Sequence, residues 1–346
     1  MFGLAYHGQT THPGKMTVLR PTTVPTRPLL TRVPLSTESL PPLTDPMTPW
    51  PGREVDLGGL RVHLRETPGP ADGTPAFYVH GLGGSATNWT ELAGQLSGRS
   101  PGHAIDLPGF GRSKPHSRPR ARLADLADTV INTIDAVAAR PVHLFGNSMG
   151  GAISLLVAAE RPDLVHTLTL ISPAVPDLRP DVRRLSDPRM LLAALPLVGR
   201  QTRRALAAAS ARERTEQMLR LCFAEPEKVS AGRIALATDE VLERDGMPWS
   251  TSSLAMATSA LFRAWLTVGE RSLWRVVHRV AAPTLVIWGD RDRLVSVRKA
   301  PRTATSLPNG RLLVLPNTGH VAQMERPTTV ARASLGMWDA VASNEW

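Results

Sequence analysis

Two patterns of apolar residues alternate along residues 53–173. Short apolar runs bounded by Gly or Pro predict buried strands, and apolar residues three and four positions apart predict helices. Gly58-Gly59, between the first two runs, predicts a hairpin turn. Strands separated by helices favour a mostly parallel sheet covered on both faces, so we expect an α/β fold. The predicted strands are 55–57, 60–64, 76–80, 103–107, 142–145 and 165–171, and the predicted helices are 123–138 and 149–160.

The pattern changes at about residue 174. Helical spacing then recurs without a clear strand over 187–195, 201–223, 226–243, 251–268 and 271–280. Strands return at 284–288 and 312–315, and a helix follows over 328–342. A helical block inside a sheet domain usually lies over the sheet. We therefore expect residues 174–282 to form an all-helical cap, and residues 51–173 and 283–346 to form the core.

Residues 1–50 show no sustained periodicity and are rich in Pro and Thr. Pro removes backbone donors and restricts the chain, so such a segment rarely forms a packed element of its own. We expect a disordered or extended arm, with a docking arm as the alternative.

A candidate nucleophile follows the predicted strand 142–145. Gly146-Asn147-Ser148-Met149-Gly150 matches the Gly-x-Ser-x-Gly nucleophile elbow, and a helical pattern follows it. A serine on a tight turn between strand and helix projects its hydroxyl above the sheet edge, and the flanking glycines let the turn close. The amides at the start of the next helix then point toward developing negative charge.

A second Gly-rich turn follows the predicted strand 76–80. Its sequence, His80-Gly81-Leu82-Gly83-Gly84-Ser85, could present a backbone N–H toward the nucleophile and complete an oxyanion hole with the Met149 amide. The competing interpretation is a phosphate-binding loop. The Gly-Lys-Ser/Thr of a Walker loop does not follow, and Gly-x-Gly-x-x-Gly is not completed, so we favour the oxyanion loop.

A reactive serine needs a base and a group that orients the base. His320 follows the predicted strand 312–315, and Asp292 follows the predicted strand 284–288. Carboxyl ends of parallel strands share one edge of a sheet, so we expect Ser148, Asp292 and His320 to meet there as a catalytic triad. Asp290 is the rival acid, and Asp177 is a more distant one.

Composition and net charge limit which binding partners we expect. The formal net charge of +10 is compatible with an anionic membrane or nucleic acid, but no block of like charges or basic patch with interleaved aromatics is present. We expect no nucleic-acid partner and leave peripheral membrane contact open.

Cys222 is the one cysteine, no Cys/His cluster has metal spacing, and no secretory or membrane-spanning pattern is evident. We expect a cytoplasmic protein without metal or organic cofactor.

Together these motifs resemble the α/β-hydrolase superfamily, in the branch with an inserted helical cap. The resemblance covers about residues 53–342 and implies that the Leu82 and Met149 amides form the oxyanion hole. It gives the loop 106–113 a structural role near the pocket. The matching motifs are His80-Gly81-Leu82-Gly83, Asp106-Leu107-Pro108-Gly109-Phe110-Gly111-Arg112-Ser113, Gly146-Asn147-Ser148-Met149-Gly150-Gly151, Trp288-Gly289-Asp290-Arg291-Asp292 and Gly319-His320.

The function expected from this resemblance is serine hydrolysis of carboxylic esters, with a small ester or lipid-like substrate. Carbon–carbon bond hydrolysis of ring-fission products is the first alternative, because those enzymes share Gly-Asn-Ser-Met-Gly-Gly. Val321, where they usually carry Trp, and the shorter Gly-rich loop are departures from their pattern. A non-catalytic binding protein is the second alternative. Candidate acyl-pocket residues in the cap, most of which could instead form the cap's own core, are Met190, Leu191, Leu192, Leu195, Leu197, Leu261, Phe262, Trp265 and Leu266.

Overall fold

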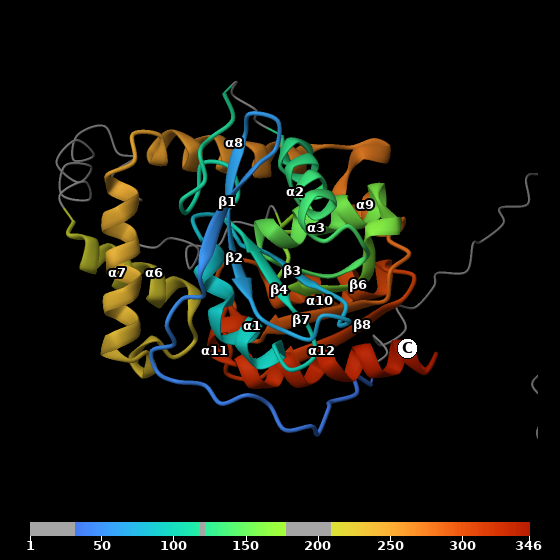
Figure 1. Ribbon diagram of the computed structural model, residues 1–346. Helices are drawn as coiled ribbons and strands as arrows, with labels where there is room; N and C mark the ends of the chain where they lie inside the picture. The colour runs from blue at the N-terminus through green and yellow to red at the C-terminus, as the bar shows by residue number, and fades with distance from the viewer. Residues whose placement is uncertain (1–31, 118–121, 178–208) are drawn as a thin grey trace, which may run out of the picture.

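A single eight-stranded sheet lies at the centre of the protein. The computed structural model describes residues 32–117, 122–177 and 209–346 (Figure 1). The strand order is β1-β2-β4-β3-β5-β6-β7-β8. Only β2 runs against its neighbours, and every pair from β4–β3 to β7–β8 is parallel, which confirms the predicted α/β class. The strands are β1 (Gly52–Asp56), β2 (Arg61–Thr67), β3 (Ala76–Val79), β4 (Gly102–Ile105), β5 (Val142–Asn147), β6 (Val165–Ile171), β7 (Thr284–Gly289) and β8 (Gly310–Leu315).

Helices cover both faces of the sheet. Figure 1 shows α2 and α3 above the sheet and α12 below it, with α1 packed on α12. The predicted hairpin is present, and its two turn residues, Gly58 and Gly59, have φ of 71° and 97°, which glycine adopts without strain. The core helices are α1 (Thr90–Leu96), α2 (Leu123–Val137), α3 (Met149–Glu160), α10 (Ala300–Ser306), α11 (Ala322–Glu325) and α12 (Pro327–Ala342).

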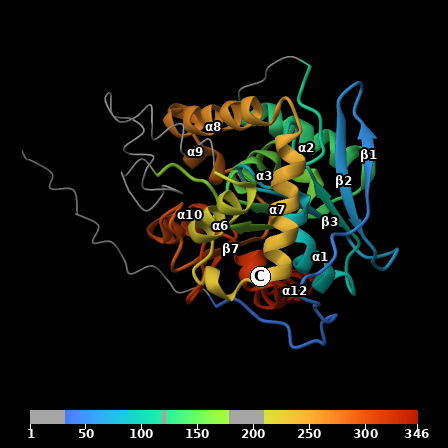
Figure 2. The same cartoon turned by 90° about the vertical axis from the view of Figure 1, so that its left-hand side faces the viewer.

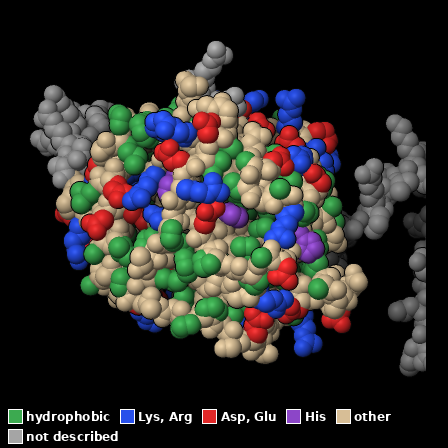
Figure 3. All heavy atoms as spheres, viewed as in Figure 1, with side chains coloured by type: hydrophobic (Ala, Val, Ile, Leu, Met, Phe, Trp, Pro, Cys, Tyr) green, Lys and Arg blue, Asp and Glu red, His purple; other side chains and the backbone are tan. Residues whose placement is uncertain are grey.

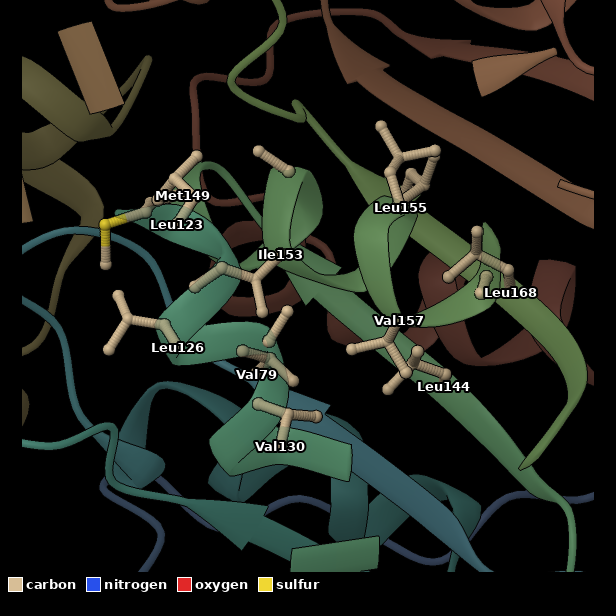
Figure 4. Packing of buried hydrophobic residues seen from close by; sticks show 14 of the residues in the cluster. Val79, Leu123, Leu126, Val130, Leu144, Met149, Ile153, Leu155, Val157 and Leu168 are labelled. Carbon is tan, nitrogen blue, oxygen red and sulfur yellow. The ribbon is translucent and has the colours of Figure 1, made fainter. Parts of the chain in front are cut away.

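The larger hydrophobic core lies between the sheet and the α2–α3 layer (Figure 4). Strand residues Val79, Leu144 and Leu168 are fully buried there. They meet α2, whose apolar residues recur at three- and four-residue spacing, and α3, which is buried on nearly all sides. Each fully buried aliphatic side chain contributes about 1.5–3 kcal/mol to folding, so this layer stabilises the packing of α3 on β5. The helix residues in Figure 4 are Leu123, Leu126 and Val130 of α2 and Met149, Ile153, Leu155 and Val157 of α3.

The described part of the insertion is helical, as the sequence predicts. α6 (Ala211–Cys222) packs on α7 (Ala231–Asp245), and α8 (Ser250–Leu266) crosses beside α2. Figures 1 and 2 both show α8 at the top of the molecule, away from α12. α9 (Leu273–Val277) packs against α3 and is buried in the core layer rather than in the cap. The helix predicted at 187–195 lies outside the described residues.

We expected residues 1–50 to form a disordered or extended arm, or a docking arm, and residues 32–50 are extended and held against the rest of the protein. They run extended beneath the fold, and Ser36 exchanges backbone and side-chain hydrogen bonds with Arg332 of α12. The Trp50 Nε1 donates to Thr90 O at 3.0 Å, and Ser230, the N-cap of α7, donates to Asp45 at 2.6 Å. This segment, the N-terminal strap, is therefore held in place because its backbone and side chains find partners in the core and at the start of α7. Residues 1–31 of the arm lie outside the described residues.

Charges on the face seen in Figure 3 are mixed. Arg and Lys side chains lie among acidic and apolar ones, without a broad basic field on that face. Many of the arginines pair with carboxylates, as Arg161 does with Asp135 and Asp163. The net positive charge of the sequence therefore does not appear on this face as one continuous surface for a polyanion.

Candidate active site

Ser148 occupies a strained turn between β5 and α3. Its φ of 54° and ψ of −120° are unfavourable for a residue with a side chain, so the surrounding packing must hold it. Gly150 and Gly146 make the turn possible: a Cβ on Gly150 would strike the Val79 carbonyl, and one on Gly146 would lie 2.5 Å from the Gly150 carbonyl. This is the geometry expected of a nucleophile elbow.

The backbone around Ser148 is tied to the neighbouring strand. The Ser148 N–H donates to Ile171 O at 3.0 Å, and the Ala174 N–H donates to Ser148 O at 2.8 Å. Met149 is the first residue of α3, so its N–H has no acceptor within the helix and lies at the positive end of the helix dipole. The turn therefore combines a half-buried hydroxyl with an adjacent amide donor.

His320 and Asp292 lie together at the same sheet edge. The His320 Nδ1 is 2.9 Å from Asp292 Oδ2, and both side chains are buried. The other carboxylate oxygen, Oδ1, accepts hydrogen bonds from the Leu294 and Val295 amides at 2.8 and 3.0 Å. Because backbone donors fix Oδ1, Asp292 holds the imidazole of His320 in one orientation. The second ring nitrogen of His320, Nε2, stays available for another partner.

The two rival acids have other partners. Asp290 accepts from the Thr318 N–H at 3.4 Å and lies near Arg291. Asp177 is buried 3.5 Å from the Lys299 ammonium and accepts from the Ser296 amide. Of these three carboxylates, only Asp292 is hydrogen-bonded to His320.

The loop that carries His320 is held from two sides. The Asn147 side-chain amide donates to His320 O and to Ile171 O, both at 3.0 Å, which ties this loop directly to the serine turn. The His320 N–H donates to Cys222 O at 2.7 Å at the end of α6. Asn147 is the variable position of the elbow motif, and its role could have been suspected only from its short polar side chain beside Ser148.

Glu325 is a second anchor that the sequence did not single out. Its carboxylate accepts from the Gly319 N–H at 2.7 Å and from the Ala224 N–H at 2.9 Å. Burial raises the pKa of this carboxyl despite those two backbone bonds. Glu325 therefore joins the histidine loop to the cap segment that follows α6.

The Gly-rich loop lies against Ser148. A Cβ on Gly81 would be 3.0 Å from the Ser148 Cβ, so only glycine fits this approach comfortably. His80 is fully buried, donates from Nδ1 to Gly81 O at 2.7 Å and accepts at Nε2 from the Leu107 N–H at 3.0 Å. Burial lowers the pKa of His80 and keeps the imidazole neutral. A neutral imidazole is required because one ring nitrogen donates a hydrogen bond and the other accepts one.

His80 thereby sets the direction of the next amide. In a trans peptide the carbonyl and the following N–H point in opposite directions. Because Gly81 O is held by His80 and by the Gly84 N–H at 3.1 Å, the direction of the Leu82 N–H is fixed as well.

The loop 106–113 supports the same region. Asp106 is buried and accepts from His63 Nδ1 at 2.8 Å and from the Ala86 and Arg112 amides at 2.7 and 3.0 Å. Burial alone would raise the pKa of Asp106, but these bonds hold it below its ordinary value. The ionised carboxylate thus fastens β2 and this loop to the segment after the Gly-rich turn.

Helix α7 of the cap binds the outer side of the Gly-rich loop. Arg244 donates to Gly83 O, and Ser85 Oγ donates to Glu240 at 3.2 Å. Arg112 pairs with Glu243 at 3.0 Å. Burial raises the pKa of Glu240 and lowers that of Arg244. Residues from the core and α7 line a small polar pocket at this contact. The position of the Gly-rich loop is therefore linked to the position of α7.

Comparison with known proteins defines the family. A model of the alpha/beta hydrolase fold matches residues 77–327, which is more than half of the chain. The chain belongs to the alpha/beta hydrolase fold family. This alpha/beta hydrolase is 30% identical over 291 residues to the dihydrolipoyllysine-residue acetyltransferase component of an acetoin cleaving system from Pseudomonas putida. That match covers 82% of this chain and 68% of the relative.

Two further similarities concern hydrolases. A 2-hydroxy-6-oxononadienedioate/2-hydroxy-6-oxononatrienedioate hydrolase from Comamonas testosteroni is 26% identical, over 82% of this chain and 92% of its own. The crystal structure of a membrane phospholipase A has a TM-score of 0.68 at 28% identity, over 84% of this chain and 86% of its own. The proteins similar to this alpha/beta hydrolase therefore include a dienedioate hydrolase, a lipase and a phospholipase.

The cap residues expected to line an acyl pocket separate into groups. Leu261 is buried, and Trp265 is half-buried with its Nε1 donating to Ala174 O at 2.8 Å. Phe262 and Leu266 are exposed, so they do not form a buried core of the insertion, and a pocket-lining role for them stays a prediction. The five candidates between 190 and 197 lie outside the described residues.

Within residues 32–117, 122–177 and 209–346, no three His, Cys, Asp or Glu side chains are grouped as a metal would need. Over the same ranges, no helix combines the length and apolar character needed to cross a bilayer.

Proposed function

We propose that this alpha/beta hydrolase cleaves carboxylic esters with Ser148 as nucleophile, His320 as base and Asp292 as the orienting acid. The observation that carries the proposal is the buried His320–Asp292 pair, joined through Asn147 to the strained turn that presents Ser148. A serine at such a turn beside an oriented imidazole is the arrangement that nucleophilic acyl transfer requires.

In this mechanism His320 takes the proton from Ser148 as the hydroxyl oxygen attacks the ester carbonyl. The carbonyl oxygen becomes an oxyanion, which the Leu82 and Met149 amides stabilise. Collapse of the tetrahedral intermediate expels the alkoxide, and His320 donates the proton to it. Water then attacks the acyl-enzyme with His320 again as base, which releases the carboxylic acid and restores Ser148. Asp292 fixes the imidazole tautomer and stabilises its cationic form.

We infer a lipid-like or otherwise hydrophobic ester as the substrate class. The similarity to a membrane phospholipase A supports an ester of this kind. The apolar residues of α8, which lies close to the Gly-rich loop, agree with a hydrophobic substrate. Carbon–carbon bond hydrolysis is the second candidate, supported by the similarity to the Comamonas testosteroni dienedioate hydrolase.

A substrate panel separates these candidates. We expect p-nitrophenyl esters to be hydrolysed, with kcat/KM rising as the acyl chain grows from acetyl to octanoyl, and a dienone ring-fission product to be cleaved far more slowly. Ser148→Ala is the control for contaminating activity. Faster cleavage of the dienone would favour the second candidate, and a strict acetyl preference would contradict the hydrophobic substrate. Turnover of neither would leave a binding role.

A further inference from the structure

Helix α8 carries apolar side chains that nothing in the described chain covers. Its inner side packs into the core through Ala257, Ala260 and Leu261. On the outer side, Phe262 is 52% exposed and Leu266 is 65% exposed, and Val268, just beyond the helix, is 86% exposed. Leu254, two turns before Phe262, is 44% exposed. We name Leu254, Phe262, Leu266 and Val268 the α8 ridge.

Positive charge accompanies this ridge. Residues 250–279 contain four arginines and one acidic residue, Glu270. Arg263 lies between the ridge residues Phe262 and Leu266, and Arg271 follows Val268 by three positions; both arginines are exposed. Alternation of exposed apolar and arginine side chains suits an interface with an anionic lipid surface, where apolar groups enter the acyl boundary and guanidinium groups meet phosphates.

The ridge also lies close to the candidate active site. A Cβ on Gly83, in the Gly-rich loop, would be 3.8 Å from Leu254 Cδ1. Near the other end of α8, Trp265 bonds Ala174 O, and the Ala174 N–H bonds Ser148 O. A surface bound along α8 would therefore be brought next to the turn that presents Ser148.

We propose that the α8 ridge docks the protein onto anionic lipid bilayers. The docking itself depends only on the exposed side chains of α8 and its extension. The idea that this docking delivers a lipid ester to Ser148 rests on the proposed function.

The test measures co-sedimentation of the full chain with vesicles, using Ser148→Ala so that lipid turnover cannot disturb the result. Vesicles contain phosphatidylcholine with or without about 30% phosphatidylglycerol. The triple variant Phe262→Gln, Leu266→Gln and Val268→Thr removes the apolar contacts. Its matched control is Leu35→Gln, Leu242→Gln and Val314→Thr, which changes three other exposed apolar residues elsewhere. Thermal melting followed by circular dichroism checks that both variants fold.

We expect the parent to bind anionic vesicles, the ridge variant to bind about tenfold or more weakly, and the control to match the parent within about twofold. Arg263→Glu with Arg271→Glu should remove the preference for anionic over neutral vesicles. A folded ridge variant that binds as tightly as the parent, or a parent that does not bind, would overturn the proposal. A vesicle-independent dimer that the ridge substitutions dissociate would instead assign the ridge to a second copy of the chain. Because the assay needs no catalysis, failure of docking and failure of the proposed function are separate results.

Discussion

At the residue scale, the candidate chemistry depends on backbone bonds that hold a few side chains in unusual positions. Ser148 keeps a positive φ because its N–H and C=O both have partners outside its own helix start. His320 is held at its amide, carbonyl and Nδ1, which leaves the imidazole little freedom to rotate. Such preorganisation lowers the reorganisation needed during proton transfer.

Asp292→Asn tests this arrangement. An amide in place of the carboxylate no longer stabilises a cationic imidazole and can enforce the wrong tautomer, so we expect kcat on an ester to fall by roughly 10³- to 10⁴-fold at neutral pH. Asp290→Asn, two residues away, should change kcat by less than about threefold because Asp290 is not bonded to His320. Steady-state kinetics of both variants measures the difference, and the reverse ranking would assign the acid to Asp290.

The sequence suggested Ser148, Asp292 and His320 as a triad because each follows an apolar strand, and parallel strands end at one edge of the sheet. The supporting residues could not be found in this way. Glu325 and Asn147 act by bonding single backbone groups of loops that are distant in sequence. The residue pattern of the sequence does not predict which loop amide will face a carboxylate in the folded chain.

At the element scale, the strands and the long core helices α2, α3 and α12 were predictable. The short helices α1, α10 and α11 and the contacts between elements were not. Helical spacing predicted α2, α3, α7 and α8 to within a few residues. The order of the strap (residues 32–50) was not predicted because the segment has no periodicity. It is held by hydrogen bonds to α12, α1 and α7 and by Val33 and Leu40, which pack against the core. The sequence did not show which side of α8 is exposed, because apolar residues lie on both its buried and its exposed side.

Gly336→Ala tests the attachment of the strap to α12. In an open helix this change gains about 1 kcal/mol of stability. Here a Cβ would strike the Pro34 carbonyl and the backbone next to it, so we expect a net loss of about 1–3 kcal/mol and faster proteolysis of residues 32–50. Urea unfolding and limited proteolysis measure the two effects. Gly98→Ala, where a Cβ meets nothing, is the control, and a stabilised Gly336→Ala would show that the strap does not pack as described.

At the scale of the whole molecule, buried neutral histidines couple folding to pH. Burial lowers the pKa of His80, His103 and His143, and that of His143 falls to about 3. The unfolded chain, with histidine near pKa 6.5, therefore binds more protons than the folded chain below that pH. Stability from these groups is complete above about pH 6.5 and is lost as the pH falls toward 3.

His143→Gln should reduce this acid sensitivity. The parent should lose about 2 kcal/mol at this one site between about pH 7.5 and 5, and the variant should lose correspondingly less. The His143 side chain bonds Thr167 and stacks on Trp338, so the variant starts from a lower stability at neutral pH. Urea unfolding at both pH values gives the slopes. His278→Gln, at an exposed histidine, should keep the parent slope, and an unchanged slope in His143→Gln would contradict the buried neutral imidazole.

The most direct test of the central claim is the site of covalent labelling by a fluorophosphonate, which reacts only with an activated serine. After proteolysis and mass spectrometry, we expect one adduct on Ser148, no adduct in Ser148→Ala and much slower labelling in His320→Ala. Labelling of a different serine, or labelling of Ser148 at an undiminished rate without His320, would contradict the account.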